Sequence, residues 1–363
     1  MHRMTATHRC LITGISALAS LIIACAPTTH TARGGGGHVL AEQKWQLVEA
    51  ERIYLQRESR INDLAWQLRT DTLDLCPNHI GRSIGMVIAD TSALKPADRD
   101  MLVDVYGSKK GVLVTHVMKD GPASAAGIQK GDFITKIDGT VIPETRAAAS
   151  YIRAITPQMR AEASGPVVIK LDRKGKPLTI EVKPQLVCTF PAILTREDSL
   201  NAYADGDRIY ITTGMYRFAQ SDQDLQAVIA HEFAHNSEGH LEKKMGNYLL
   251  GSILDVAAAV YGINTQGVFG QAGAGLYSKD FEREADYVGM YYLARSSIDT
   301  ANVRSFWRRM AVEHPGGIRE HYQSTHPSTA ERWANLQAAH EEIVTKLETG
   351  AALLPERKTR IER

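Results

Sequence analysis

The chain has 363 residues, with 42 Lys and Arg against 41 Asp and Glu, and a net charge of +1. This length is enough for two domains that each bury a hydrophobic core. The balanced charge argues against a large nucleic-acid-binding surface, which needs a clear basic excess, so we expect no nucleic-acid partner.

The N-terminal segment has the features of a bacterial lipoprotein signal. Basic residues precede an apolar run from Leu11 to Ala24, which has the length of a signal-peptide core and is short for a membrane span. The run ends in Ile-Ile-Ala-Cys, which resembles a lipobox, so residues 1–24 would be removed and Cys25 would carry lipid. Ala26 then suggests the outer membrane. The alternatives are an ordinary signal peptide cut nearby and an uncleaved anchor.

The next two segments differ in composition. Residues 25–38 include four consecutive glycines and predict a flexible tether. From Glu42 to Leu75, apolar residues recur at near-helical spacing with charges between them, which predicts one long helix or a broken pair. We assign residues 39–76 to a helical part that packs on the C-terminal domain.

Two cysteines remain after the signal and the lipidation site, Cys76 and Cys188. In an oxidising envelope compartment, a leftover pair suggests a disulfide. The two residues also bracket the next module. We therefore predict a bridge at the base of an inserted domain that spans residues 77–187.

The sequence of this insert predicts a β-rich domain. Alternating apolar residues in Gly111–Met118 and Lys130–Ile142 predict strands, Gly-Asp and Asp-Gly pairs predict turns, and Ala147–Ile155 predicts a short helix. The pattern resembles a PDZ domain of the bacterial envelope-protease type.

This resemblance implies that the insert binds extended peptide ends by strand addition. The loop that holds a terminal carboxylate and the strand that lines the groove would come from Ile84, Gly85, Met86 and Val87. The alternative is a PDZ fold that serves only as a spacer or lid.

The strongest chemical signal is Val-Ile-Ala-His-Glu-Phe-Ala-His, which ends at His235. It places His231 and His235 four residues apart, so on a helix both imidazoles lie on one face and can reach one ion. Glu232 stands between them and can take a proton from a metal-bound water. The alternative is a surface helix with two solvated histidines.

A second predicted helix supplies a third ligand, because Glu282 and Asp286 are separated by four residues. A catalytic zinc takes three protein ligands and keeps one position for water. We therefore expect one Zn²⁺ per chain, bound by the two histidines and Glu282, with Asp286 accepting the other N–H of a ligand histidine. Glu284 is the competing ligand.

Two further segments lie between these motifs. Leu249–Tyr261 is strongly apolar, contains Asp255 and is short for a membrane span, so we expect a buried helix. A surface-docked amphipathic segment is the alternative. Residues 264–275 are rich in Gly, Gln and Ala and predict a mobile loop near the site, for which a lid or plug role is a hypothesis.

At these motifs the chain resembles the HtpX, Oma and CAAX-prenyl-protease family of zinc peptidases, metallopeptidase family 48, a gluzincin family. The resemblance rests on His-Glu-Phe-Ala-His, on Phe-Glu-Arg-Glu-Ala-Asp, on Asn-Ala-Tyr-Ala from Asn201 and on Thr325–Arg332. It implies a mostly helical zincin-type domain with a small sheet at residues 188–350. A charged tail without a core would follow at residues 351–363.

The resemblance also assigns roles around the cleft. Asn201, Ala202 and Tyr203 would form the sheet edge on which a substrate strand pairs. His326 and Arg332 would face the cleft and stabilise the oxyanion of the tetrahedral intermediate. The alternative for His326 is that it only caps the following helix.

The sequence therefore predicts an α+β protein, in which a helical zincin-type domain with a small sheet carries an inserted PDZ domain. We expect a zinc endopeptidase of the bacterial cell envelope that is lipid-anchored, faces the periplasm and cleaves misfolded or misassembled envelope proteins. Its partners would be protein substrates and a PDZ ligand. The alternatives are a lipid-anchored chaperone or assembly factor with latent peptidase activity, and a processing protease with one partner.

Overall fold

The computed structural model divides the chain into two compact units, Met1–Leu47 and Val48–Arg363, and the second contains the predicted site. The described residues are 29, 34–107, 110–143, 165–261, 263–275, 278–313, 315 and 330–358. Three expected features lie outside them, namely the lipidation site Cys25, the short helix predicted at Ala147–Ile155 and His326. None of the helices in the described ranges combines the length and apolar character needed to cross a membrane.

Helix α2 (Gly36–Asp71) is continuous, so the segment forms one long helix rather than a broken pair. Ile61, Ala65 and Leu68 are spaced by four and three residues, which puts them on one face of the helix. All three are buried in the C-terminal core. This segment therefore belongs to the packing of the larger domain, as its apolar spacing predicted.

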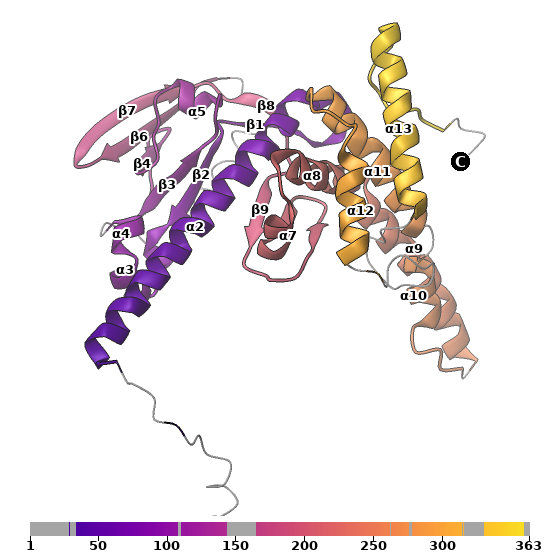
Figure 1. Ribbon diagram of the computed structural model, residues 1–363, viewed down its shortest axis with the longest axis horizontal. Coiled ribbons are helices and arrows are strands. Elements are labelled where there is room, and N and C mark those ends of the chain that lie inside the picture. The colour runs from indigo at the N-terminus through magenta and orange to yellow at the C-terminus, as the bar shows by residue number, and fades with distance from the viewer. Residues whose placement is uncertain are drawn as a thin grey trace, which may run out of the picture. The chain divides into compact units, whose positions relative to one another are not determined.

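The insert is built on an antiparallel sheet with the strand order β2–β3–β4–β6–β7, and β5 pairs with β4 (Figure 1). The strands are β2 (Met86–Asp90), β3 (Val112–Val117), β4 (Phe133–Ile137), β5 (Thr140–Val141), β6 (Val167–Arg173) and β7 (Lys176–Val182). Its short helices are η3 (Thr91–Ala93), α3 (Pro96–Met101), α4 (Val103–Tyr106) and α5 (Pro122–Ala125). Val112, Ile134 and Ile169 contribute to a core of its own. Among the described strands, β2 is at one edge of this sheet.

The insert leaves and rejoins the larger domain at one place. Two short 3-10 turns, η1 (Leu73–Leu75) and η2 (Pro77–His79), follow α2. Strands β1 (Ile80–Ser83) and β8 (Gln185–Cys188) then pair antiparallel. Beside this pair, the Sγ atoms of Cys76 and Cys188 are bonded at 1.95 Å, and both cysteines are fully buried. The disulfide therefore lies at the base of the insert.

The C-terminal domain combines a small sheet with seven described helices. The sheet has the order β10–β11–β9, in which β10 pairs antiparallel and β9 parallel with β11. Its strands are β9 (Ala192–Thr195), β10 (Ala202–Ala204) and β11 (Ile209–Thr212). The helices are α7 (Thr213–Phe218), α8 (Asp222–Ser237), α9 (His240–Val260), α10 (Val268–Gly275), α11 (Ser278–Arg295), α12 (Val303–Glu313) and α13 (Ala330–Thr349). This arrangement confirms the α+β class.

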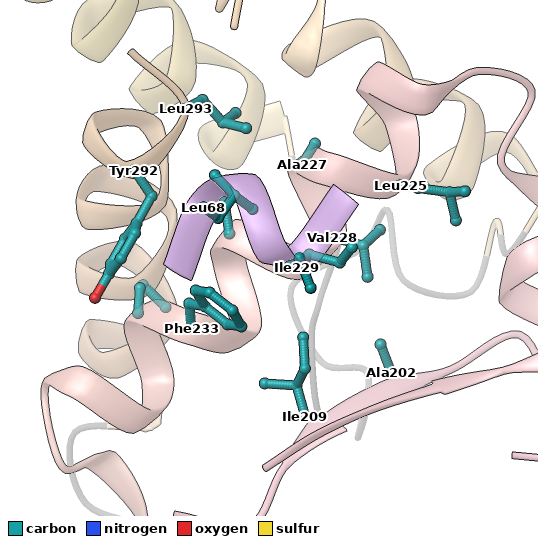
Figure 2. Close-up of a cluster of buried hydrophobic side chains, with 14 of the residues drawn as sticks. Leu68, Ala202, Ile209, Leu225, Ala227, Val228, Ile229, Phe233, Tyr292 and Leu293 are labelled. Atoms are coloured by element: carbon teal, nitrogen blue, oxygen red, sulfur yellow. The ribbon is translucent and has the colours of Figure 1, made fainter. Parts of the chain in front are cut away.

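The core of this domain surrounds α8, most of whose residues are buried. Figure 2 shows Phe233 of α8 between Leu68 of α2, Ile209 of the sheet and Tyr292 of α11. The rings of Phe233 and Tyr292 meet edge to face with centroids 5.8 Å apart, a favourable geometry for aromatic pairs. These contacts hold helix α8 in place on several sides.

Two expectations between the metal motifs are wrong. Leu249–Tyr261 covers the second half of α9 and the residue that follows it, but its large apolar side chains are exposed, and His240 is the one buried residue of that helix. The expected loop at residues 264–275 contains helix α10, which packs on α9. The apolar composition correctly predicted a helix at Leu249–Tyr261, but it did not predict that the side chains are exposed.

The C-terminal tail also differs from the expectation of a segment without a core. Pro355 is buried, and the Arg357 guanidinium donates to the Glu238 carboxylate at 2.7 Å. The Glu356 amide donates to the hydroxyl of Tyr287 at 3.0 Å. The first part of the tail is therefore attached to α11 and to the end of α8.

We expect the disulfide to contribute strongly to stability. The Cys76→Ala/Cys188→Ala variant opens a loop with a sequence separation of 112 residues, and the loss of loop-closure restraint should lower the free energy of unfolding by about 2–5 kcal/mol. Urea unfolding measures this difference. Wild-type protein treated with reductant serves as the control and should match the variant. Equal midpoints for the variant and the oxidised wild type would contradict the prediction.

Candidate active site

Local residues at both ends of helix α8 determine where it begins and ends. The Ser221 hydroxyl accepts from the Asp224 amide at 3.1 Å, an N-cap that satisfies one of the free donors of the first turn. Asp222 and Asp224 add negative charge at the positive end of the helix dipole. The helix stops before Gly239, which takes a left-handed conformation with φ of 63°. His231 and His235 thus lie on one regular helix and share a face.

Helix α11 brings Glu282 to these histidines. Nε2 of His231 lies 3.2 Å from Nε2 of His235 and 3.4 Å from a Glu282 oxygen, and Nε2 of His235 lies 3.5 Å from the other Glu282 oxygen. All three donor atoms lie within 4.8 Å of one another. Two imidazole nitrogens and one carboxylate form the donor set of a catalytic zinc site with an open position. The residues present therefore fit the metal that the sequence predicts.

Asp286 holds the far side of His231. Its Oδ1 lies 2.9 Å from His231 Nδ1, so it can accept that N–H and leave Nε2 free for a metal. The guanidinium of Arg332 donates to the same carboxylate oxygen at 2.5 Å and stacks 3.4 Å above the Trp307 ring. All these groups are buried, so the orientation of His231 is held by a closed set of contacts.

Arg332 was expected to face the cleft, but the structure places its Nη2 elsewhere. Its Nη2 lies 3.3 Å from His231 Nδ1, on the side of the ring opposite the nitrogen that faces His235 and Glu282. Nη2 of Arg332 therefore contacts Asp286 and His231 on the side of the imidazole ring that faces away from His235 and Glu282. The other proposed oxyanion group, His326, lies outside the described residues.

His235 has its own support, which sequence reasoning missed. His240 Nδ1 lies 2.9 Å from His235 Nδ1, and His240 Nε2 lies 2.9 Å from a Glu284 oxygen. Because His235 needs Nε2 free for a metal, its Nδ1–H donates to His240, which in turn donates its Nε2–H to Glu284. Glu284, the competing ligand in the sequence, is thus the end of this chain of hydrogen bonds. The only signal was a histidine just after a helix-ending Gly239.

The two ligand histidines differ in the direction in which their pKa values are shifted. Burial opposes a charge on His231, but hydrogen bonds to Asp286 and Glu282 outweigh it and raise the pKa of His231 to about 9. Burial lowers the pKa of His235, which is therefore neutral at pH 7. The hydrogen bond from His240 holds the pKa of Glu284 below its usual value. Without a metal, His231 is therefore the ligand histidine that is protonated on both nitrogens and carries a positive charge at pH 7.

A cleft of about 190 Å³ opens beside the cluster. Its lining includes the predicted substrate strand, which is Asn201, Ala202 and Tyr203, as well as Glu232 and His235. Among the strands that the structure describes, β10 is at the edge of its sheet, and Glu232 is only 2% exposed. The cleft therefore combines an open strand edge with a sheltered carboxylate.

The predicted groove residues of the insert lie around the start of β2. Ile84 is buried in the core of the insert. Gly85 has a φ of 74°, and a Cβ there would lie 3.1 Å from the Trp66 ring of α2, so a glycine is needed. Met86 and Val87 are half-buried on the edge strand. The start of the edge strand is therefore packed against α2.

Two family models match the chain. Residues 171–340 match peptidase family M48, and residues 99–183 match the PDZ domain. Both matches agree with the resemblances seen in the sequence.

Several curated relatives match part of the chain. The mitochondrial metalloendopeptidase OMA1 of Schizosaccharomyces pombe is 29% identical over 160 residues, 42% of this chain and 48% of the relative. The putative beta-barrel assembly-enhancing protease of Vibrio cholerae is 30% identical over 140 residues, 34% of this chain and 29% of the relative. The beta-barrel assembly-enhancing protease of Escherichia coli is 26% identical over 136 residues, 33% of this chain and 28% of the relative. The chain thus spans less than half the length of these relatives.

Solved structures match the insert weakly. The HtrA3 PDZ domain bound to a phage-derived ligand is 24% identical and covers 30% of this chain and 89% of that one, with a TM-score of 0.23. A likeness this low adds nothing to the family match.

Zinc affinity should depend steeply on pH. Because His231 must lose a proton before it binds a metal and has a pKa of about 9, the apparent affinity should rise about tenfold per pH unit between pH 6.5 and 8.5. Competition with a chromogenic chelator measures it. Asp286→Asn removes one hydrogen bond that raises this pKa, so its affinity should level off at a lower pH. A pH-independent wild-type affinity would contradict the assignment.

Proposed function

We propose that this chain, which carries a peptidase family M48 domain at residues 171–340 and a PDZ domain at residues 99–183, is a zinc-dependent endopeptidase. The observation that carries the proposal is the cluster of His231, His235 and Glu282 beside an open strand edge. Names such as metalloendopeptidase among the relatives support it.

Glu232 is the proposed general base. A zinc ion bound by the cluster would act as a Lewis acid on the scissile carbonyl and lower the pKa of its water. Glu232 lines the cleft with His235 and is sheltered from solvent, which suits a carboxylate that takes a proton from the attacking water. It would then return the proton to the leaving amine. One residue thus serves both proton transfers.

The remaining polar groups would position the ligands. Asp286, supported by Arg332, would hold His231 through Nδ1, and His240 would do the same for His235. Such outer contacts fix the ring orientation and the tautomer of metal-binding histidines. We retain His326 as the proposed oxyanion group.

The substrate would bind as an extended strand. The edge of β10 at Asn201, Ala202 and Tyr203 can pair with a peptide through main-chain hydrogen bonds. Because main-chain pairing does not depend on the side chains of the substrate, this mode of binding suits an enzyme that accepts many substrate sequences. The PDZ domain would add selectivity by binding a carboxyl-terminal or extended peptide, with Ile84–Val87 at its groove.

The biological setting is proposed from the relatives and the N-terminal sequence. Beta-barrel assembly-enhancing proteases among the relatives favour a role in the bacterial envelope, and the lipobox-like sequence at Cys25 favours a lipid anchor at the outer membrane facing the periplasm. We propose misfolded or misassembled envelope proteins as substrates.

Glu232→Gln tests the mechanism. The variant should retain one zinc per chain, because Glu232 is not a proposed ligand, but lose casein cleavage by about 10²–10⁴-fold, because glutamine takes no proton. Fluorescent casein measures the rate, and atomic emission measures the bound metal. Glu348→Gln, an exposed glutamate on α13, is the matched control and should cleave like the wild type.

Wild-type cleavage by Glu232→Gln would rule out this mechanism. Retention of envelope function by a variant that no longer cleaves would instead favour the chaperone or assembly-factor alternative.

A further inference from the structure

The cleft beside the metal cluster has a third wall that the proposed mechanism does not use. Strand β10 lines one side of the cleft, and residues of α8 line another. The third wall comes from the start of α9 and from α11, and it consists of Leu241, Lys244 and Phe281. Because one cleft of about 190 Å³ contains all these residues, a peptide that pairs with β10 lies within reach of the third wall.

Two members of the third wall are apolar, and contacts within the fold hold them in place. Leu241 is 43% exposed, and a Cβ on Gly206 would lie 3.8 Å from its Cδ2, so Leu241 packs against the loop that follows β10. The Phe281 ring stacks on the His240 imidazole with centroids 4.8 Å apart. The two side chains offer an apolar surface to the aliphatic part of a substrate side chain.

Lys244 adds a positive charge to the third wall. It follows Leu241 by three residues on α9, so the two side chains share a face of the helix. Lys244 is half-buried, whereas its neighbours Lys243 and Met245 are exposed. Lys243 pairs with Glu284 at 3.7 Å, but in the described part of the chain no carboxylate pairs with Lys244. An ammonium group without a counterion in these described residues therefore lines the cleft.

The acidic groups around the cleft do not neutralise Lys244. Glu232 and Glu282 line the cleft, but a zinc ion bound there would balance both with its two positive charges. Asp205, in the loop after β10, accepts hydrogen bonds from two backbone amides and from a tyrosine hydroxyl. The acidic residues close in sequence to Lys244 and Phe281 lie outside the cleft lining: Glu242, Asp280 and Glu284. With zinc bound, Lys244 therefore makes the charge of the lining positive.

We propose that Leu241, Phe281 and Lys244 form a subsite for a glutamate side chain of the substrate near the scissile bond. The two apolar residues contact the methylene groups of the glutamate, and the ammonium group pairs with its carboxylate. A lysine at the same substrate position is disfavoured, because it brings a like charge close to Lys244. This inference rests on the proposed peptidase function and adds a side-chain preference to main-chain pairing along β10.

Peptide binding to the zinc-loaded Glu232→Gln protein tests the subsite without cleavage. The probes are dye-labelled octapeptides of threonine and alanine with an amide at the carboxyl end, so they offer no terminal carboxylate to the PDZ domain. Glutamate, glutamine or lysine occupies one position, which is moved along the peptide. Fluorescence anisotropy measures the dissociation constants. At one position, the glutamate peptide should bind about two- to fivefold more tightly than the glutamine peptide, as for a partly exposed ion pair, and the lysine peptide should bind most weakly.

Adding a second substitution identifies the residue responsible. Lys244→Glu should reverse the order of the three peptides, and Lys244→Arg should retain it. Because no ion pair of Lys244 is found within the described residues, neither change should alter the circular dichroism spectrum. The matched control is Lys279→Glu, which makes the same charge change at an exposed position of α11 outside the cleft lining. It should keep the original order.

Three binding results would overturn the subsite. They are an unchanged order in Lys244→Glu, equal binding of the glutamate and lysine peptides at every position, and no binding of any peptide. Cleavage of the same peptides by the wild type reports separately on the proposed function. Peptides that bind in the expected order but stay intact would reject the peptidase and retain the subsite. Cleavage with equal kcat/KM for glutamate and lysine peptides would reject the subsite and retain the peptidase.

Discussion

The metal cluster depends on how closely α11 approaches α8. A Cβ on Gly289 would lie 3.3 Å from the carbonyl oxygen of Ala230 and from Cα of His231, closer than most Cβ contacts, so the two helix backbones approach each other closely here. Glu282 lies seven residues earlier, two helical turns away and on the same face. The close approach of the two backbones at Gly289 therefore helps to place Glu282 beside both histidines. The donor set is therefore fixed by a backbone contact.

The two ligand histidines are supported in different ways. His231 is held by a buried carboxylate that also binds the Arg332 guanidinium, so its partner is fixed deep in the core. His235 is held through His240, whose other nitrogen donates to the half-exposed Glu284. One histidine thus has a buried carboxylate directly behind it, and the other is joined through a second histidine to a half-exposed carboxylate. Both arrangements fix the Nδ1 proton and direct Nε2 toward the proposed metal.

Local residue spacing predicted those parts of the site that lie on a single helix. His231, Glu232 and His235 follow helical spacing, and so do Glu282 and Asp286. Contacts between distant segments could not be predicted from the sequence. No spacing rule relates His240 to Glu284, and none gives the side of the His231 ring on which Arg332 lies. The burial of Leu249–Tyr261 was predicted wrongly, because an apolar run predicts a helix but does not show whether the rest of the fold covers it.

The disulfide at the base of the insert changes the covalent topology of the molecule. Cys76 and Cys188 close a ring that contains the entire PDZ domain, and β1 and β8 pair directly beside the closure. A single peptide-bond cut anywhere within that ring leaves helix α2 covalently joined to the catalytic helices. A cut within the PDZ domain therefore does not separate α2 from the helices that carry His231, His235 and Glu282.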